Sequence, residues 1–272
     1  MSSASGRART RAQAGARAAA GALSPARSAP GQPAYVLHHH DWSESSLILD
    51  LFTRESGRLA VAAKGAKRPY SQLRSVLLPL QRITVLLSKP AKTEGGEVLT
   101  LRQAEWAGGA TLPAGAALFS GYYLNELLLK LLARHDPHRA LFDAYADALA
   151  ELAQGDVVLR AFELKLLFEL GLLPDLSVVT PTQAEVDPAR RYQLSAEGGV
   201  VPASGDAGLA GQLLIQLQAA LLHGSPAALR QACGLDAPGL KLTLRGLLHY
   251  HLGHQPLRTR ALMLDLQNLL DK

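Results

Sequence analysis

The hydrophobic period of the sequence changes near residue 110, and this change limits what the chain can fold into. Between residues 35 and 106, apolar side chains alternate over short runs, as they do on β-strands with one buried face. Beyond residue 115 they recur with the spacing of amphipathic helices. A glycine- and proline-rich segment, 107–115, separates the two regions. The sequence therefore predicts an α+β protein in which a small β domain precedes an all-α helical domain.

The first region is expected to form five strands, at residues 35–39, 47–52, 58–63, 76–87 and 97–105. The second of them has a purely aliphatic face, made by Leu47, Leu49 and Leu51. Pro79 indicates an edge or a bulge in the fourth, because proline has no amide hydrogen for a central ladder position. Five short strands without intervening helices favour a five-stranded oligonucleotide-binding barrel (OB fold) over residues 34–106.

Helical segments are expected at 118–134, 137–153, 156–171, 209–222, 225–233, 238–252 and 257–270, within a helical domain that spans residues 107–272. Residues 172–208 lose this period and collect four prolines, so we expect a loop-rich insertion with one hairpin near 191–202. Asn125 and Glu126 interrupt the apolar run of the first helix, and they are predicted to hold the contact between the domains.

A basic stretch runs through the second strand of the predicted hairpin, 58–63, and into the loop that follows it. Its cations are Arg54, Arg58, Lys64, Lys67, Arg68 and Arg74, which fall within 21 residues that contain one acid, Glu55. Tyr70 lies in the exit loop, and this combination suits a nucleic-acid backbone with unstacked bases. Trp42 is a second candidate for stacking, with a place in the core or at the barrel rim as its alternative. For the cations, the alternative is a solvated charge run.

Five short motifs follow one another in the order and spacing of a known family: 35–38 (YVLH), 42–47 (WSESSL), 52–58 (FTRESGR), 63–66 (AKGA) and 78–80 (LPL). They resemble the amino-terminal half of the bacterial RecO recombination mediators, and residues 245–262 resemble the carboxyl end of that family. The resemblance runs from residue 34 to residue 270 and is weakest across the insertion.

This resemblance implies an OB barrel and a non-enzymatic protein of DNA repair and recombination. Such a protein would bind single- and double-stranded DNA and anneal complementary strands. With its partner RecR, it would help to load the RecA recombinase onto DNA coated by single-strand-binding protein.

The same resemblance implies that the acidic, apolar tail of single-strand-binding protein docks on the helical domain. Arg160 matches a basic position of the family and Leu170 an apolar wall, and Lys241 is a third candidate. The alternative is an ordinary surface pair between Arg160 and Glu163, one helical turn apart. Many RecO-like proteins bind zinc through cysteines in the insertion, but residues 172–208 contain no cysteine. The resemblance therefore implies no zinc site in this chain.

The sequence offers no catalytic motif and no cofactor site. It contains no GxxxxGK[ST] phosphate loop, no HExxH motif and no pair of cysteines. The three consecutive histidines at 38–40 would alternate between the faces of a strand, which makes a poor metal shell. Two other functions stay open. One is a metal-dependent nuclease that uses Asp41, Glu44 and Asp50, and the other is a basic scaffold for an acidic protein partner.

Charge and cysteine content limit the partners and the compartment. A formal net charge of +5 and an isoelectric point near 9.4 favour acidic partners such as nucleic acid. The single cysteine, Cys233, is expected to be a small buried residue, and its lack of a partner fits a cytoplasmic, nucleoid-associated protein. No apolar run approaches the ~20 residues needed to cross a bilayer, so no membrane partner is expected. We expect a monomer.

Residues 1–33 contain five arginines and no acid among mostly Ala, Ser, Gly and Pro. Such a segment buries too little apolar surface to offset the entropy of ordering, so a disordered basic extension is predicted. A mitochondrial transit peptide has a similar composition and is the alternative.

Overall fold

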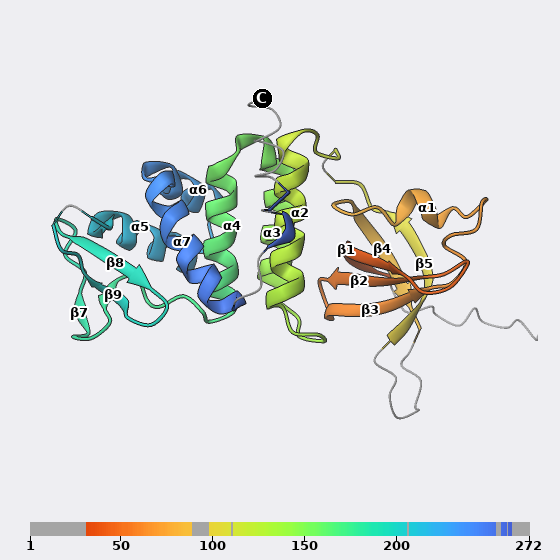
Figure 1. Cartoon of the computed structure of the whole chain (residues 1–272), viewed down its shortest axis with the longest axis horizontal. Coiled ribbons are helices and arrows are strands. Elements are labelled where there is room, and N and C mark those ends of the chain that lie inside the picture. Colours follow the sequence, from red (N-terminus) through yellow and green to blue (C-terminus); the bar gives the residue numbers. More distant parts are fainter. Residues whose placement is uncertain are drawn as a thin grey trace, which may run out of the picture. The chain divides into compact units, whose positions relative to one another are not determined.

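The computed structural model describes residues 31–88, 98–109, 111–205, 207–253, 257–259 and 261–262. In this part of the chain, five strands close into a barrel in the order β1-β2-β3-β5-β4 (Figure 1). They are β1 (Gln32–Asp41), β2 (Leu47–Thr53), β3 (Gly57–Ala63), β4 (Arg82–Leu87) and β5 (Val98–Trp106). Neighbouring strands pair antiparallel, except that β3 and β5 are parallel, and β1 pairs with β4 to close the ring. The predicted OB barrel is confirmed.

Strand β2 takes part in two hydrophobic cores. Its predicted aliphatic face points into the barrel, where Leu49 and Leu51 are fully buried. Phe52 points the opposite way and belongs to the cluster of the helices, with its ring 5.3 Å from that of Phe142. Tyr35 of β1 lies in the same cluster. The helices therefore pack directly on the outer face of the barrel.

The helices of the second domain are α2 (Ala116–Leu131), α3 (Arg139–Glu151), α4 (Asp156–Glu169), α5 (Gly211–Leu222), α6 (Pro226–Leu235) and α7 (Ala237–Leu252), with the short 3-10 turn η1 (Leu152–Gln154) after α3 (Figure 1). Two of them begin with a side-chain cap. Ser225 Oγ accepts a hydrogen bond from the Ala228 amide, and Asp236 Oδ1 accepts one from the Gly239 amide. A proline in the first turn follows each cap, as is typical of helix starts. These helices match the predicted segments except at their ends.

The segment between α4 and α5 is the predicted loop-rich insertion, and it contains the predicted hairpin. Strands β8 (Arg191–Ser195) and β9 (Gly199–Pro202) pair antiparallel, and β10 (Leu209–Ala210) pairs with β8 on the other side. A second small pair, β6 (Val178–Val179) with β7 (Ala184–Glu185), has no counterpart in the sequence prediction. Two-residue strands are too short to show a hydrophobic period.

A buried polar contact links the two domains. Asn125 on α2 donates through Nδ2 to the Leu37 carbonyl oxygen of β1 at 3.0 Å, and its Oδ1 accepts a hydrogen bond from the Tyr145 hydroxyl of α3. A buried amide that is satisfied on both sides fixes one orientation of α2 on the barrel. The predicted role of Asn125 is confirmed. That of Glu126 is wrong, because its carboxylate accepts hydrogen bonds from the Thr259 backbone and side chain near the carboxyl end.

The fourth predicted strand, 76–87, is wrong in its first half. Helix α1 (Leu73–Val76) occupies the start of this region, and β4 begins only at Arg82. Pro79 makes a single bridge to Val36, and Leu80 has a φ of 66°, a conformation that interrupts a strand. At the other end of the barrel sequence, β1 begins at Gln32, two residues ahead of the predicted boundary at 34.

Some predictions concern residues that the structure does not describe. Residues 1–30 of the predicted basic extension lie outside the described part of the chain, as does most of the predicted helix 257–270. Among the helices that are described, none combines the length and the apolar content needed to cross a membrane.

Asn125→Ala is expected to lower the free energy of unfolding by about 2–4 kcal/mol. The change leaves the Leu37 carbonyl and the Tyr145 hydroxyl buried without their partner, and each such group costs about 1–3 kcal/mol. Urea denaturation followed by circular dichroism measures the difference. Gln216→Ala, which removes an exposed amide from α5, should change stability by less than about 0.5 kcal/mol. Equally small effects of both variants would contradict the role of Asn125.

Candidate nucleic-acid interface

The loop between β3 and α1 is fixed to the barrel at its first turn. Ala66 is buried among the residues of the barrel core. The Lys67 amide donates to the Ser45 carbonyl oxygen of the β1–β2 connection at 3.0 Å. The Arg68 amide then donates to Gly65, and the Ser71 amide donates to Arg68, so the loop is a series of turns. Its backbone is anchored, and its longer side chains project from that anchor.

Five predicted DNA-binding residues come together here, and we call them the loop site: Lys64, Lys67, Arg68, Tyr70 and Arg74. Lys64, Arg68 and Arg74 are exposed, and the Tyr70 residue is 97% exposed. Among the described residues, Lys67 is the member of the set that forms an ion pair, with its Nζ 3.0 Å from Asp41 Oδ2. The loop site therefore presents positive charge and an aromatic ring to solvent.

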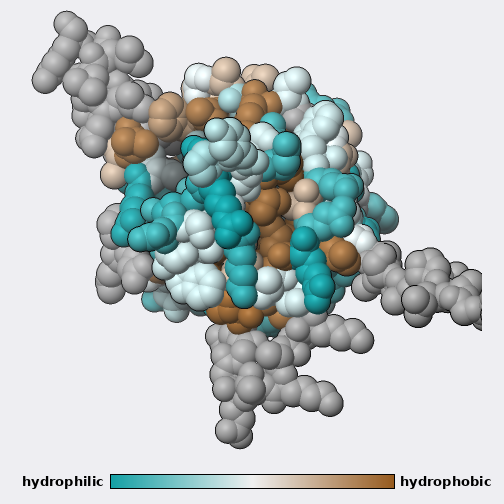
Figure 2. All heavy atoms as spheres, turned by 90° about the vertical axis from the view of Figure 1, so that its right-hand side faces the viewer, coloured by the Kyte–Doolittle hydropathy of each residue, from teal (hydrophilic) through white to brown (hydrophobic). Residues whose placement is uncertain are grey.

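Two tryptophans add aromatic surface to the barrel. Trp42, next to Asp41, is more than half exposed, which rules out its alternative place in the core. Trp106 at the end of β5 is also exposed, and sequence reasoning did not single it out. Figure 2 shows this side of the molecule, where hydrophilic side chains gather around a strip of hydrophobic surface. Exposed rings beside cations are the elements of a single-strand binding surface.

Arg54 and Arg58 lie apart from the loop site. In the β2–β3 hairpin, Leu47 pairs with Ala63 at the loop end and Thr53 pairs with Gly57 at the other end. Seven residues of strand separate these ends by about 20 Å at ~3.3 Å per residue. The structure thus divides the predicted set of cations between the two ends of one hairpin.

Both of these arginines contact the helical domain. Arg54 Nε and one terminal nitrogen of its guanidinium donate to the two oxygens of Asp143 on α3, at 2.9 and 2.8 Å. This hydrogen bonding raises the pKa of Arg54 and lowers the pKa of Asp143. Arg58 donates to the Leu129 carbonyl oxygen of α2 at 2.9 Å. Their predicted role in DNA binding stays a prediction, and in this structure they connect the barrel to the helices.

Arg160 is inside the helical domain. Its side chain is 7% exposed and that of Glu163 is 1% exposed, and the two are joined at 2.6 Å. The Tyr123 hydroxyl donates to the same Glu163 oxygen, also at 2.6 Å. Burial raises the pKa of Glu163 to about 7, although Arg160 acts to lower it. The alternative interpretation of a surface pair is wrong, because the helices around α4 cover both side chains.

The other two predicted tail-binding residues are placed differently. Lys241 on α7 is exposed and pairs with Asp156, one helical turn before Arg160 on α4, at 2.8 Å. Leu170 follows the last turn of α4, ten residues from Arg160, which is about 15 Å along the helix axis. Because Arg160 is buried and Leu170 lies at the other end of α4, the three residues do not form one exposed surface.

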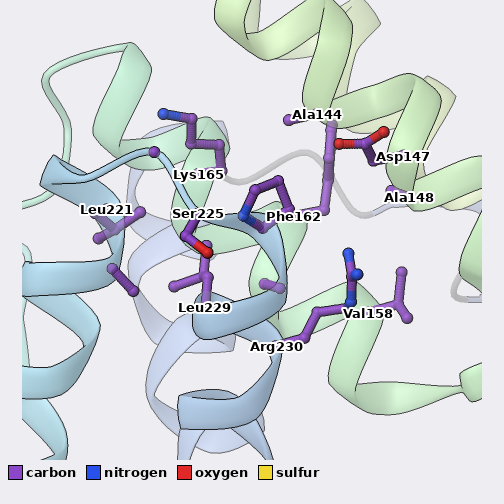
Figure 3. Close-up of a pocket in the computed structure, with 14 residues that line it drawn as sticks. Ala144, Asp147, Ala148, Val158, Phe162, Lys165, Leu221, Ser225, Leu229 and Arg230 are labelled. Atoms are coloured by element: carbon purple, nitrogen blue, oxygen red, sulfur yellow. The ribbon is translucent and has the colours of Figure 1, made fainter.

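An apolar cavity of about 50 Å³ opens between α3, α4, α5 and α6 (Figure 3). Phe162, Val158 and Leu229 form apolar walls, and Lys165 and Arg230 are the cations that line it. Lys165 is paired with Glu169 at 2.6 Å. None of Arg160, Leu170 and Lys241 lines the cavity, so sequence reasoning missed it. Its residues come from four helices, and no single stretch of sequence identifies it.

Two of the three carboxylates suggested for a nuclease lie against cations. Asp41 pairs with Lys67, and Asp50 lies 3.7 Å from nitrogens of Arg58, Arg134 and His40. Among the described residues, no group of three or more His, Cys, Asp or Glu side chains is placed to hold a metal ion. These cations would compete with a divalent metal at both carboxylates.

Cys233 is buried as predicted. Burial raises the pKa of its thiol to about 12, which keeps the group protonated and unreactive at neutral pH.

The OB barrel, its exposed basic loop and the attached helical domain place this protein in the class of barrel proteins that bind nucleic acid. Residues 31–110 match the family described as Recombination protein O N terminal, and residues 113–261 match Recombination protein O C terminal. The chain belongs to the RecO family of DNA repair proteins, which confirms the resemblance seen in the sequence and supports a role in DNA repair and recombination.

Curated relatives agree with this assignment. The DNA repair protein RecO of Albidiferax ferrireducens is 50% identical over 246 residues, which cover 88% of this chain and 96% of the relative. Those of Acidovorax ebreus and Paracidovorax citrulli are 51% and 52% identical over 261 residues, which cover 90% of this chain and 99% of each relative.

Arg160→Ala is expected to lower the free energy of unfolding by about 3–5 kcal/mol at pH 8, because it leaves the Glu163 carboxylate buried without its cation. The loss should be smaller at pH 6. A buried acid with a raised pKa binds more protons in the folded state, so its cost grows as pH rises above its unfolded pKa. Urea denaturation at both pH values measures the loss, with the exposed Arg245→Ala as control. A variant as stable as the control would mean that the pair is not structural.

Proposed function

We propose that this protein is a DNA-binding recombination mediator that makes and breaks no covalent bonds. It would bind single- and double-stranded DNA, anneal complementary strands and, together with RecR, help to load the RecA recombinase onto DNA coated by single-strand-binding protein. The observation that carries the proposal is the loop site, where exposed cations surround an exposed tyrosine on an OB barrel. Membership of a family of DNA repair proteins supports it.

The mechanism follows from charge neutralisation. Two complementary strands repel each other through their phosphates, and Lys64, Arg68 and Arg74 would reduce this repulsion by replacing the counterions of one backbone. Tyr70 would stack on a base of the bound strand and keep it from stacking on its neighbours, which favours pairing with an incoming strand. Neither step needs a nucleotide or a metal ion.

The helical domain would recruit the DNA that is to be remodelled. We propose that it binds the acidic, apolar tail of single-strand-binding protein. Of the residues predicted for this contact, Lys241 is exposed, whereas Arg160 could reach a peptide only after its buried pair with Glu163 had opened. The cavity beside Phe162 offers the tail an apolar pocket together with the cation of Arg230. We therefore favour the cavity as the place where the tail docks.

The two other functions have less support. A nuclease would use Asp41, Glu44 and Asp50 to bind a metal, and two of these carboxylates, those of Asp41 and Asp50, lie against cations. A scaffold for an acidic protein would use the same loop site, so binding experiments must decide between that protein and DNA.

Reversing the charge of the loop, with Lys64→Glu, Lys67→Glu and Arg68→Glu together, is expected to abolish oligonucleotide binding and strand annealing. For the wild-type protein the logarithm of the binding constant should fall with the logarithm of salt concentration with a slope of about −3, since each phosphate neutralised by the loop contributes about −0.7. Fluorescence anisotropy with a labelled single strand measures binding, and a strand-annealing assay without nucleotide measures function.

The control for this variant is Arg190→Glu, which reverses an exposed charge in the insertion. It should leave binding and annealing unchanged. Undiminished affinity of the triple variant would contradict the proposed function and favour the scaffold. Magnesium-dependent cleavage of the oligonucleotide by pure protein would establish the nuclease instead.

Arg230→Glu is expected to weaken the binding of a peptide with the acidic, apolar tail sequence about tenfold or more, because it replaces the attractive charge at the cavity with a repulsive one. Isothermal titration with the peptide measures the affinity. Oligonucleotide binding should be unchanged, because Arg230 lies on α6 and the loop site lies on the barrel. If Lys241→Glu weakens the peptide and Arg230→Glu does not, the tail docks on α7 and the cavity assignment is wrong.

A further inference from the structure

A second cationic cluster lies where the outer face of the barrel meets the helical domain. Its centre is Asp50 on β2, which is mostly buried. Three cationic or titratable side chains approach its carboxylate at 3.7 Å: His40 from β1, Arg58 from β3 and Arg134 from the connection that follows α2. We call His38, His40, Asp50, Arg58 and Arg134 the junction cluster.

The junction cluster is left with unsatisfied positive charge. One carboxylate faces two guanidinium groups, and distances of 3.7 Å are too long for hydrogen bonds. Asp50 Oδ1 and Arg58 Nε are buried without a hydrogen-bond partner among the described residues. Arg134 keeps 40% of its side chain exposed and His40 keeps 59%. An anion with several oxygens could therefore reach Arg134 and His40 from solvent and share the cations with Asp50.

The two histidines extend the cluster along β1. His38 is opposite Asp50 and His40 is opposite Ile48, so both lie on the same outer face, and their rings are 4.4 Å apart. Burial lowers the pKa of His38, the neighbouring His40 and His39 lower it further, and Asp50 partly opposes them. Arg258, near the carboxyl end, also lowers this pKa. His38 is therefore poised to gain a proton when a negative charge approaches.

The cluster is continuous with the loop site. Residue 41 follows His40 directly, and the Asp41 carboxylate pairs with Lys67 of the loop. Along the outer face of β1 and β2, positive or titratable groups therefore extend from the loop site to Arg134. The distance is about the length of β2, about 20 Å at ~3.3 Å per residue.

We propose that the junction cluster is a second contact for the DNA backbone, so that a single strand held at the loop site continues across β1 and β2 and ends against Arg134 and Arg58. This inference rests on the proposed function, because it needs a strand at the loop site. It adds the path of the strand and a dependence on pH. His38 would take up a proton when phosphates bind, and acid would therefore strengthen binding.

The charges around the histidines determine the sign of this effect. Burial, His40, His39 and Arg258 disfavour protonation of His38, whereas Asp50, which also faces Arg58 and Arg134, favours it. A bound phosphate adds negative charge and raises the pKa of His38 in the complex. The complex then holds more protons than the free protein, so affinity falls as pH rises from 6 to 8.

The first test compares oligonucleotide binding at pH 6 and pH 8 by fluorescence anisotropy, using a labelled thymidine strand of about 15 nucleotides, within the range of sites on OB folds. The wild-type protein should bind about threefold to tenfold more tightly at pH 6. The double variant His38→Gln with His40→Gln should lose most of this difference. His223→Gln, which changes an exposed histidine after α5, should retain it.

The second test uses Arg134. Arg134→Gln should weaken binding of the long strand about threefold to tenfold and reduce the salt slope by about 0.7, the value for one phosphate contact. Arg134→Lys keeps the charge and should restore the slope. A strand of about five nucleotides, which covers the loop site alone, should bind equally to the wild-type protein and to Arg134→Gln.

The outcomes separate this inference from the proposed function. If the wild-type protein binds no oligonucleotide, or if the triple loop variant binds as tightly as the wild type, the proposed function fails. If the loop variant loses binding while Arg134→Gln and the double histidine variant match the wild type at both pH values, the second contact does not exist. If Arg134→Gln weakens the short strand as much as the long one, the strand does not follow the proposed path.

Discussion

The structure depends on the burial of the outer face of the barrel beneath the helices. Tyr35 and Phe52 leave the barrel wall on the side opposite its core and pack against Phe142 and Tyr145 of α3. An OB barrel on its own would expose these rings to water. Because aromatic side chains bury large apolar areas, separating the domains would cost several kcal/mol. The barrel and the helices are therefore fixed against each other, and the loop site has a fixed position relative to the helical domain.

Close backbone approach reinforces this contact. Gly57, in the β2–β3 turn, has a φ of 69°, and a Cβ atom there would lie 2.0 Å from the Asp136 carbonyl oxygen of the α2–α3 connection. The turn that brings Arg54 and Arg58 to the helices thus needs glycine. The same hairpin places Lys64 and its neighbours at its other end, away from the carboxylates of α3. The cations nearest the helices become structural, and those farthest from them stay exposed.

Sequence reasoning could predict features that depend on near neighbours. The two faces of β2 follow from strict alternation, and the caps of α6 and α7 follow from a Ser-Pro pair and an aspartate ahead of a proline. The same reasoning failed where the partner is distant in sequence. Arg54 is 89 residues from its partner Asp143, and Arg58 is 71 residues from its partner Leu129. The sequence therefore does not show that these two arginines contact the helices while the other cations of the basic stretch stay exposed. Both interpretations of Arg160, as a tail-binding residue and as half of a surface pair with Glu163, assumed exposure, because helical spacing alone does not reveal that other helices cover the two side chains.

The single acid of the junction cluster has a physical role if the cluster binds DNA as proposed. Without Asp50, Arg58 and Arg134 would face each other without compensation at the domain boundary, and their repulsion would oppose the packing of α2 on the barrel. With Asp50 at 3.7 Å, the repulsion is reduced but no guanidinium is saturated, so a phosphate can bind without first displacing a tight salt bridge. Weak internal pairing would also permit rapid release, as the proposed transfer of strands between partners requires. The same carboxylate can therefore stabilise the fold in the free protein and leave the surface ready for DNA.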